Sequence, residues 1–390
     1  MKRYRVAHVI TRLCQGGAQE NTFHTVRLAN RDRFDVDLIA GYPKGREGSL
    51  EGAVAAAGLS LLREPTLVRN PAPLRDLLAV RRLTRRFREG GYDIVHTHTS
   101  KAGFVGRLAA ERAGVPMVVH TPHGNVFHGY FSGPVTRACV WMERHAARRT
   151  DRIIELTPGG IEEHLAEGIG QREQYRVIFS GIDTAPYAVA ILQRAAKRRS
   201  LGIEVDTPLV GAVGRLEPVK GFTYFVEAAS RIAAEAPDVR FVLAGQGGEE
   251  SRLRALAAPL GDRFRFLGQQ DDVAALMAAL DVLIVPSVNE GMGRVLLEAG
   301  AAETPVVATC VGGIPDIVDD SETGLLVPPR DPEALARGVL ELLRAPERLR
   351  LMGATARAKV VPHFSLESMV RRIEALYEEL ILEKQHDPRR

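Results

Sequence analysis

The sequence contains little cysteine and no long apolar run. Its three cysteines, Cys14, Cys139 and Cys310, lie far apart in a chain of 390 residues, so neither a disulfide framework nor a zinc site is predicted. The first apolar stretch covers only Val6 to Ile10 and is too short for the core of a signal peptide. We therefore expect reduced thiols, no membrane span and a location in the cytoplasm.

Charged residues are abundant but unevenly distributed. With 45% hydrophobic and 26% charged residues, the chain is globular and long enough for two domains of roughly 100–200 residues each. Residues 1–180 contain 27 Lys and Arg against 18 Asp and Glu, a net charge of +9, whereas residues 181–390 contain 25 against 30, a net charge of −5. The first half is therefore the basic half.

The basic residues of the first half form two runs, Arg81–Arg88 and Arg144–Arg152, and the second run follows Trp141. A basic helix with an aromatic anchor can lie on an anionic membrane surface, so peripheral binding at the inner face of the membrane is one hypothesis. A solvated helix face is the alternative. Nucleic acid is not expected as a partner, because no recognised binding module is present.

Apolar strands and helical segments alternate along the chain. The first strand, predicted over Tyr4–Ile10, is followed by Gly16 and Gly17 and then by a helix. Paired glycines let a backbone approach a ligand closely, but the dinucleotide-binding pattern G-x-G-x-x-G is absent there. The alternation predicts an α/β protein with parallel sheets, in which ligands bind at the carboxyl ends of the strands.

A D-x-D sequence occurs at Asp35 and Asp37, at the start of the strand predicted over Phe34–Ala40. Aspartates that bind a metal ion together with a substrate are expected at the carboxyl end of a strand, whereas here the apolar residues come afterwards. We interpret both residues as strand-entry residues and predict no metal site.

Five histidines cluster near the predicted ends of two successive strands. His96 and His98 lie at strand spacing, and His120, His123 and His128 follow in a loop rich in Pro and Gly. The grouping predicts a cleft. A helical H-E-x-x-H zinc motif is absent, so contact with a sugar and structural hydrogen bonding are the two main interpretations, with metal binding a minor one.

A continuous apolar run within Asp281–Ser287 predicts a strand buried on both faces, and a tight glycine loop and a helix start follow it as far as Ala302. Glu290 lies in the loop and Glu298 on the helix, with seven residues between them. The start of a helix carries unpaired N–H groups and attracts anions. Leu209–Gly221 repeats the arrangement and places two cations, Arg215 and Lys220, beside the next helix. Such cations suit a diphosphate.

Taken together, these motifs resemble the retaining glycosyltransferases of family 4. The resemblance covers nearly the whole chain and is strongest from Gly211 to Pro329. It implies a GT-B fold, in which two Rossmann-like domains with parallel sheets face an interdomain cleft. The implied domains are 1–180 for the acceptor and 181–365 for a nucleotide sugar, with a C-terminal helix, 366–390, packing across both. The sequence departs from the family at Gln246, where relatives often have an acidic residue, and at Asp316, where they usually have Glu.

The resemblance also implies roles for individual residues. Arg215 and Lys220 would stabilise the diphosphate, Glu290 would contact the transferred sugar, and His123, in the sequence HTPHG, would lie close to that sugar. Glu298 would hold the ribose hydroxyls. The residues expected to bind the donor are Gly16, Gly17, Arg215, Lys220, Gly268, Gln269, Glu290, Gly291, Met292, Gly293, Arg294 and Glu298.

The expected reaction is retaining sugar transfer from a nucleotide sugar, with a UDP-sugar favoured over GDP-mannose and no metal or cofactor required. The acceptor would be a glycan or a lipid-linked molecule in the synthesis of a cell-surface polysaccharide or glycoconjugate. A nucleotide-sugar epimerase of GT-B fold and a non-enzymatic sugar-binding protein are the alternatives.

Overall fold

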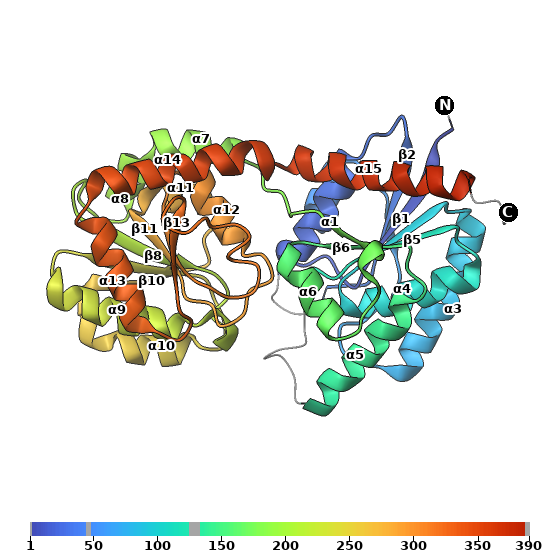
Figure 1. Ribbon diagram of the computed structural model, residues 1–390, viewed down its shortest axis with the longest axis horizontal. Coiled ribbons are helices and arrows are strands. Elements are labelled where there is room, and N and C mark those ends of the chain that lie inside the picture. Colours follow the sequence, from blue (N-terminus) through green and yellow to red (C-terminus); the bar gives the residue numbers. More distant parts are fainter. Residues whose placement is uncertain (1, 44–47, 125–132, 387–390) are drawn as a thin grey trace. The chain divides into compact units, whose positions relative to one another are not determined.

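The computed structural model describes residues 2–43, 48–124 and 133–386, and it consists of two units. The first unit contains Met1–Gly181 and Leu366–Arg390, and the second contains Ile182–Ser365. Each unit is a parallel β-sheet with helices on both faces (Figure 1). The first unit is therefore built from the two ends of the chain, and the second from one continuous segment.

The sheet of the first unit has seven parallel strands in the order β3-β2-β1-β4-β5-β6-β7. The strands are β1 (Tyr4–Ile10), β2 (Phe34–Ala40), β3 (Leu61–Arg63), β4 (Ile94–His98), β5 (Met117–Thr121), β6 (Arg152–Glu155) and β7 (Tyr175–Val177). The register pairs His8 of β1 with His96 of β4, and His98 of β4 with Thr121 of β5. Polar side chains of three central strands are thereby brought side by side.

Helices cover both faces of this sheet. They are α1 (Gly17–Leu28), α2 (Glu51–Ala56), α3 (Pro73–Gly90), α4 (Ser100–Ala113), α5 (Gly133–Ala147), α6 (Pro158–Ala166) and α15 (Leu366–Gln385). Because side chains alternate along a strand, Val6 and Ile10 of β1 face the core shared with α1 and α15, whereas Ala7 and Val9 face the core shared with α3 and α4. Figure 1 shows α3, α4 and α5 on one face and α1 and α15 on the other.

The C-terminal helix α15 is grouped with the first unit, although it follows the second unit in the sequence. The apolar stripe of this helix is buried in the core of the first unit, and it consists of Leu366, Met369, Val370, Ile373, Leu376, Tyr377 and Leu380. The same core contains Val6, Phe34 and Ile94 of the sheet. Residues 387–390 of the predicted helix lie outside the described residues.

The sequence LLREPTLVRNP, residues 61–71, predicts a loop between α2 and α3, but the segment contains a strand, so that prediction is wrong. β3 occupies Leu61–Arg63 and pairs with β2 through Leu38 and Leu61. It is a three-residue edge strand whose side chains are all half-buried, so no apolar alternation marks it in the sequence.

The sheet of the second unit has six parallel strands in the order β10-β9-β8-β11-β12-β13. The strands are β8 (Leu209–Val213), β9 (Arg240–Ala244), β10 (Phe264–Gly268), β11 (Val282–Val285), β12 (Val306–Thr309) and β13 (Gly324–Val327). All four residues of β11 are buried, as its continuous apolar run predicted.

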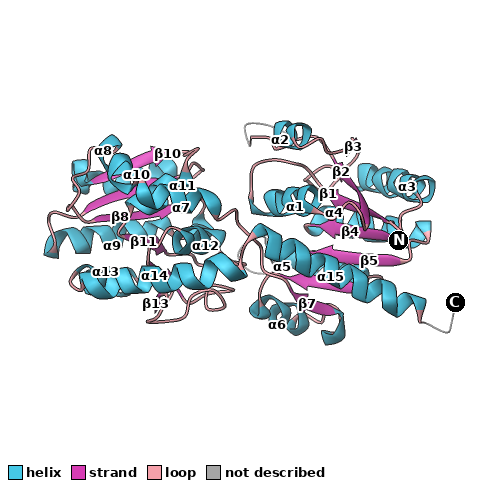
Figure 2. Cartoon of the chain, turned by 90° about the horizontal axis from the view of Figure 1, so that it is seen from above, coloured by secondary structure: helices cyan, strands magenta, loops and turns pink. Residues whose placement is uncertain are grey.

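The helices of the second unit lie on the two faces of its sheet (Figure 1), and Figure 2 looks down on the unit, with helices cyan and strands magenta. They are α7 (Ala185–Leu192), α8 (Arg194–Ser200), α9 (Phe222–Glu235), α10 (Glu250–Ala257), α11 (Val273–Ala279), α12 (Arg294–Ala301), α13 (Pro332–Leu343) and α14 (Pro346–His363). Asp272 and Asp331 cap α11 and α13 by accepting hydrogen bonds from Ala275 N and Ala334 N, as their positions just before these helices favour. Among the described residues, no helix combines the length and apolarity needed to cross a bilayer.

Asp35 and Asp37 lie inside β2 and are engaged by neighbouring side chains. Asp35 forms ion pairs with Arg3 and Arg5, and Asp37 accepts a hydrogen bond of 2.7 Å from the Tyr92 hydroxyl. These partners hold the two aspartates as structural residues of the strand.

Candidate active site

The order of strands in the second unit reverses between β8 and β11. The chain runs outward from β8 through β9 to β10, and then returns to form β11 on the other side of β8. Ligands of such sheets bind at the carboxyl ends of the strands at this reversal. The loops that follow β8 and β11 are the two loops that carry Lys220 and Glu290, and Val288 N donates to Val219 O at 2.9 Å between them.

Lys220 and Glu290 form the centre of the candidate site. Nζ of Lys220 lies 2.5 Å from Oε2 of Glu290, and the buried Ser287 hydroxyl donates to the same oxygen at 3.1 Å. The Glu290 side chain is only 12% exposed and that of Lys220 is 22% exposed. The two donors therefore fix the carboxylate in a partly desolvated position, where its charge acts more strongly than in water.

Two glycines allow the surrounding loops to close around this pair. A Cβ on Gly221 would lie 2.0 Å from Pro286 O, and a Cβ on Gly312 would lie 1.9 Å from Glu290 O. Both glycines have positive φ, 66° and 51°. In addition, Gly313 N donates to Glu290 O at 3.1 Å. Any larger residue at these positions would displace the backbone that carries Glu290.

The remaining predicted residues of the second unit lie on other loops at the carboxyl ends of its strands. Gly268 ends β10, and its carbonyl accepts from Gly245 N at 2.8 Å, which joins the loops after β9 and β10. Gln269 follows it directly. Arg215, by contrast, is 66% exposed and pairs with Glu217 of its own loop at 3.0 Å.

The start of α12 holds most of the other predicted donor-binding positions. Gly291 is exposed, Met292 is buried, and Gly293 precedes the helix as its N-cap with a φ of 71°. Arg294 is the first helical residue, and the half-buried Glu298 lies one turn further along. The structure therefore collects these positions at the carboxyl end of β11.

His123, Gly16 and Gly17 belong to the first unit. Gly16 is the N-cap of α1 and Gly17 its first residue, in the loop that follows β1. The sheet order reverses here too, between β1 and β4, and the Thr11 and Thr99 hydroxyls after these strands lie 3.4 Å apart. His123 lies two residues after the end of β5 and has a φ of 63°, and its Nε2 lies 2.9 Å from Nδ1 of His98.

The predicted histidine cleft is wrong for three of the five histidines. His96, His98 and His120 are buried inside the sheet, where the strand register stacks their rings against neighbouring polar side chains. His96 and His98 have ring centroids 4.2 Å apart, and His120 Nδ1 lies 2.9 Å from the Thr97 hydroxyl. These histidines make structural hydrogen bonds. His128 lies outside the described residues.

Two members of the histidine cluster were not identified from the sequence. His8 lies within β1, and Tyr377 reaches the cluster from α15; the Tyr377 hydroxyl is 2.6 Å from Nδ1 of His96 and 3.3 Å from Nε2 of His8. A histidine inside an otherwise apolar strand was an available signal at His8. Tyr377 lies on the apolar stripe of α15, so the sequence gave no signal that its hydroxyl joins the histidine cluster.

Burial keeps these imidazoles neutral. Desolvation of the charged ring lowers the pKa of His8 to about 3, with a further contribution from the charge of Arg31. Burial likewise lowers the pKa of His123 to about 3 and holds the pKa values of His96, His98 and His120 well below the usual range. At neutral pH each ring therefore has one N–H donor and one acceptor nitrogen.

Three of the buried histidines are close enough together for a metal ion. Ligand nitrogens of His8, His96 and His98 lie within 4.8 Å of one another. However, all six ring nitrogens already have hydrogen-bond partners, either another ring of the cluster or the side chains of Thr121, His123 and Tyr377. Metal binding would break several of these bonds, so the group fits a hydrogen-bonded network better than a metal centre.

The comparisons with known proteins cover both units. The family model described as "Glycosyl transferase 4-like domain" matches residues 16–181, and the one described as "Glycosyl transferases group 1" matches residues 193–359. An Escherichia coli protein, UDP-Gal:alpha-D-GlcNAc-diphosphoundecaprenol alpha-1,3-galactosyltransferase, is 30% identical over 387 residues, which are 98% of each chain. The chain belongs to glycosyltransferase family 4.

Further relatives of this glycosyltransferase include a D-inositol 3-phosphate glycosyltransferase of Salinispora tropica. It is 35% identical over 316 residues, which are 75% of this chain and 65% of that protein. Among solved structures, Anabaena HepE in complex with UDP aligns with a TM-score of 0.80 at 23% identity, covering 97% of this chain and 100% of that chain. The predicted family and the GT-B fold of two Rossmann-like domains are thus confirmed.

Proposed function

We propose that this glycosyltransferase moves a sugar from a UDP-sugar to a lipid-linked or glycan acceptor, with retention of configuration and without a metal ion. The observation that carries the proposal is the Lys220–Glu290 pair at the strand-order reversal, because it places a cation and a carboxylate where a nucleotide sugar would bind. The full-length Escherichia coli relative is named for a UDP-sugar and a diphosphoundecaprenol-linked acceptor, which supports both substrate classes.

The proposed chemistry depends on the charge that develops as the donor breaks. The bond between the anomeric carbon and the phosphate oxygen cleaves, the acceptor oxygen bonds to that carbon from the same face, and the acceptor proton passes to the departing diphosphate. Lys220 would stabilise the diphosphate. Arg215 would do so as well once its side chain leaves Glu217. Glu290 would contact the transferred sugar, as would His123, and Glu298 would hold the ribose.

A donor assay without metal tests this proposal. The protein is incubated in EDTA with UDP-galactose, UDP-glucose, UDP-N-acetylglucosamine or GDP-mannose, with and without a polyprenyl diphosphate-linked sugar. We expect a UDP-sugar to be consumed only when the acceptor is present, and at an unchanged rate in EDTA, because cationic side chains replace the metal. Isomerisation without acceptor would indicate an epimerase, and binding without turnover a sugar-binding protein. Activity lost in EDTA and restored by Mg²⁺ or Mn²⁺ would contradict metal independence.

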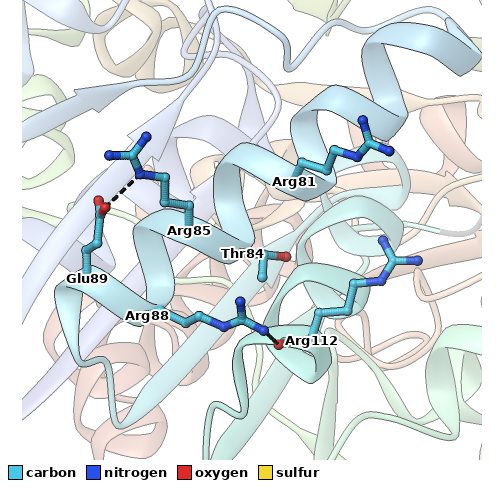
Figure 3. A pocket seen from close by; sticks show the side chains of 6 residues that line it. All are labelled: Arg81, Thr84, Arg85, Arg88, Glu89 and Arg112. Atoms are coloured by element: carbon cyan, nitrogen blue, oxygen red, sulfur yellow. Dashed lines mark hydrogen bonds and ion pairs between the residues drawn. The ribbon is translucent and has the colours of Figure 1, made fainter.

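A lipid-linked acceptor would bring the protein to a membrane, and α3 has the composition for this contact. Leu74 is 86% exposed, and Leu77 and Leu78 are exposed beside it. The following turns expose arginines, and a surface pocket between α3 and α4 is lined by Arg81, Thr84, Arg85, Arg88, Glu89 and Arg112 (Figure 3). Exposed leucines followed by an arginine cluster are typical of helices that lie in a membrane interface. We therefore propose that α3 contacts anionic lipid.

The second basic run contributes less free charge than its sequence indicated. Trp141 on α5 is 62% exposed, as an aromatic anchor requires. Arg149, however, forms an ion pair with Glu111 of α4 and also donates to His145 O. Its charge is largely engaged within the unit. Arg85 of α3 is likewise paired with Glu89, but α3 also exposes three leucines beside its arginine cluster, so α3 is the better target for a test.

Reversing two charges on α3 is expected to weaken binding to anionic vesicles strongly. The double variant Arg81→Glu and Arg85→Glu removes two cations, each contributing about 1 kcal/mol near an anionic surface, so co-sedimentation should weaken by a factor of about 30 or more. The wild-type binding should fade as salt is raised. The matched control is Arg252→Glu with Arg254→Glu, two exposed arginines of α10 in the second unit. No sedimentation of the wild type at low salt would remove the membrane contact and leave the donor site unaffected.

A further inference from the structure

Six side chains of the first unit form one continuous hydrogen-bonded chain through its core. From one end to the other, the members are Thr121, His96, Tyr377, His8, His98 and His123. The successive distances are 2.8 Å from Thr121 Oγ1 to His96 Nε2, 2.6 Å from His96 Nδ1 to the Tyr377 hydroxyl, 3.3 Å from that hydroxyl to His8 Nε2, 2.9 Å from His8 Nδ1 to His98 Nε2, and 2.9 Å from His98 Nδ1 to His123 Nε2. The first five members are buried.

All the hydrogen bonds of this chain of six side chains can form together in only two arrangements of the protons. A neutral imidazole has one N–H and one acceptor nitrogen, and a tyrosine hydroxyl between two rings donates to one while accepting from the other. If Tyr377 donates to His8, every ring in the chain carries its proton on Nδ1. If Tyr377 donates to His96, every ring carries its proton on Nε2. The four histidines are therefore coupled, and a proton placement at one end fixes the placement at the other.

The chain ends at His123, which shows two signs of constraint. Its φ of 63° lies in the left-handed region, which a residue with a Cβ occupies at a cost. Its Nδ1 is shielded from solvent and has no hydrogen-bond partner among the described residues. A shielded polar atom without a partner is costly unless a ligand completes it. Within the described residues, one hydrogen-bonding position is thus open at the end of this hydrogen-bonded chain.

We propose that this chain is a positioning device for His123, which fixes whether Nδ1 of His123 donates or accepts the hydrogen bond to the transferred sugar. His8, His96, His98 and Tyr377 act through His123 and touch no substrate themselves. The inference rests on the sugar contact proposed above for His123. Its distinctive consequence is that Tyr377, in the core on α15, influences transfer through proton placement rather than through packing.

Nitrogen NMR of selectively ¹⁵N-histidine-labelled protein tests the coupling directly, because it distinguishes the Nδ1–H from the Nε2–H form. In the wild type, the same form is expected at His8, His96, His98 and His123. The variant Tyr377→Phe removes one hydroxyl and keeps the ring, so it should leave His123 in a mixture of both forms. It should also lower kcat by about 2–10-fold at an unchanged KM for the donor.

The control is Tyr175→Phe, which removes another tyrosine hydroxyl of the same unit, 3.2 Å from Nδ1 of the buried His164 and outside the chain. Neither the four protonation forms nor kcat should change in it. If Tyr377→Phe does not fold, Thr121→Val is used instead, because it removes the hydrogen bond to His96 at the opposite end of the hydrogen-bonded chain. The same changes are then expected in the protonation form of His123 and in kcat.

A mixture of Nδ1–H and Nε2–H forms among the four histidines of the wild type would overturn the coupling. A shift of their ring-nitrogen NMR signals on adding one equivalent of Zn²⁺ would overturn it too. Mixed forms in Tyr377→Phe with kcat unchanged would overturn the positioning role. Absence of any transferase activity in the wild type would refute the proposed function instead, and the NMR result would still decide whether the chain is coupled.

Discussion

Glu290→Gln should reduce kcat for sugar transfer by about 10²–10³-fold while UDP affinity changes by less than about threefold. The substitution is structurally conservative, because a glutamine oxygen can still accept from Lys220 Nζ and the Ser287 hydroxyl. Only the negative charge is lost. That charge matters most in the transition state, when the sugar acquires positive character as its bond to the diphosphate breaks.

Glu298→Gln is the matched comparison and should show the opposite pattern. Hydrogen bonds from ribose hydroxyls to a carboxylate contribute about 1.5–3 kcal/mol, so loss of the charge should raise the Kd for UDP by about 10–100-fold. Titration calorimetry with UDP and single-turnover transfer separate the two effects. Equal UDP affinity in wild type and Glu298→Gln, or a kcat unchanged by Glu290→Gln, would contradict the respective role.

Acid should destabilise the first unit much more than the second. The folded pKa values of His8 and His164 are about 3 because of burial, whereas an unfolded histidine titrates near 6.5. Stability from these groups is fully present above pH 6.5 and is lost as the pH falls toward 3, because the unfolded state then binds more protons. By pH 5 each of these two histidines should lower the free energy of unfolding by about 2 kcal/mol. His96, His98 and His120 act in the same direction.

One buried group opposes this trend. Burial raises the pKa of Glu155 to about 8, so its contribution to stability falls as the pH rises from about 4.5 to 8 and returns on acidification. The stability that Glu155 restores on acidification offsets the loss from about one histidine, so the destabilisation by the other histidines remains.

The second unit is an internal control for the acid effect, because its one histidine is the exposed His363. Hydrogen exchange followed by mass spectrometry at pH 7 and pH 5, corrected for intrinsic rates, should show lost protection in β1 and β4 but not in β8 and β11. Equal losses in both units would contradict the prediction.

The loops after β8 and β11 could be located from the sequence, because the apolar strands that precede them are local patterns. A glycine, a cation or a carboxylate at the end of an apolar strand is visible without knowing the neighbours, so Lys220 and Glu290 were each identified. Their pairing was not, because it depends on β11 lying beside β8. The fold class followed in the same way from the alternation of strands and helices.

Long-range register explains what sequence reasoning missed in the first unit. His8 becomes part of the histidine chain because β1 pairs with β4, which begins more than eighty residues later. Tyr377 is 281 residues from His96, its hydrogen-bond partner. No local sequence pattern indicates either contact. The sequence therefore predicted a cleft lined by five histidines, of which His96, His98 and His120 are buried.

The construction of the first unit from both ends of the chain has a consequence for biosynthesis. Domains normally fold in the order in which they leave the ribosome. Here the core formed by Val6, Phe34 and Ile94 stays uncovered until α15 has been translated, whereas the second unit is complete once Ser365 has emerged. The N-terminal unit is therefore the last to finish folding, and throughout translation of the second unit its open apolar face requires protection from aggregation, as a chaperone could provide.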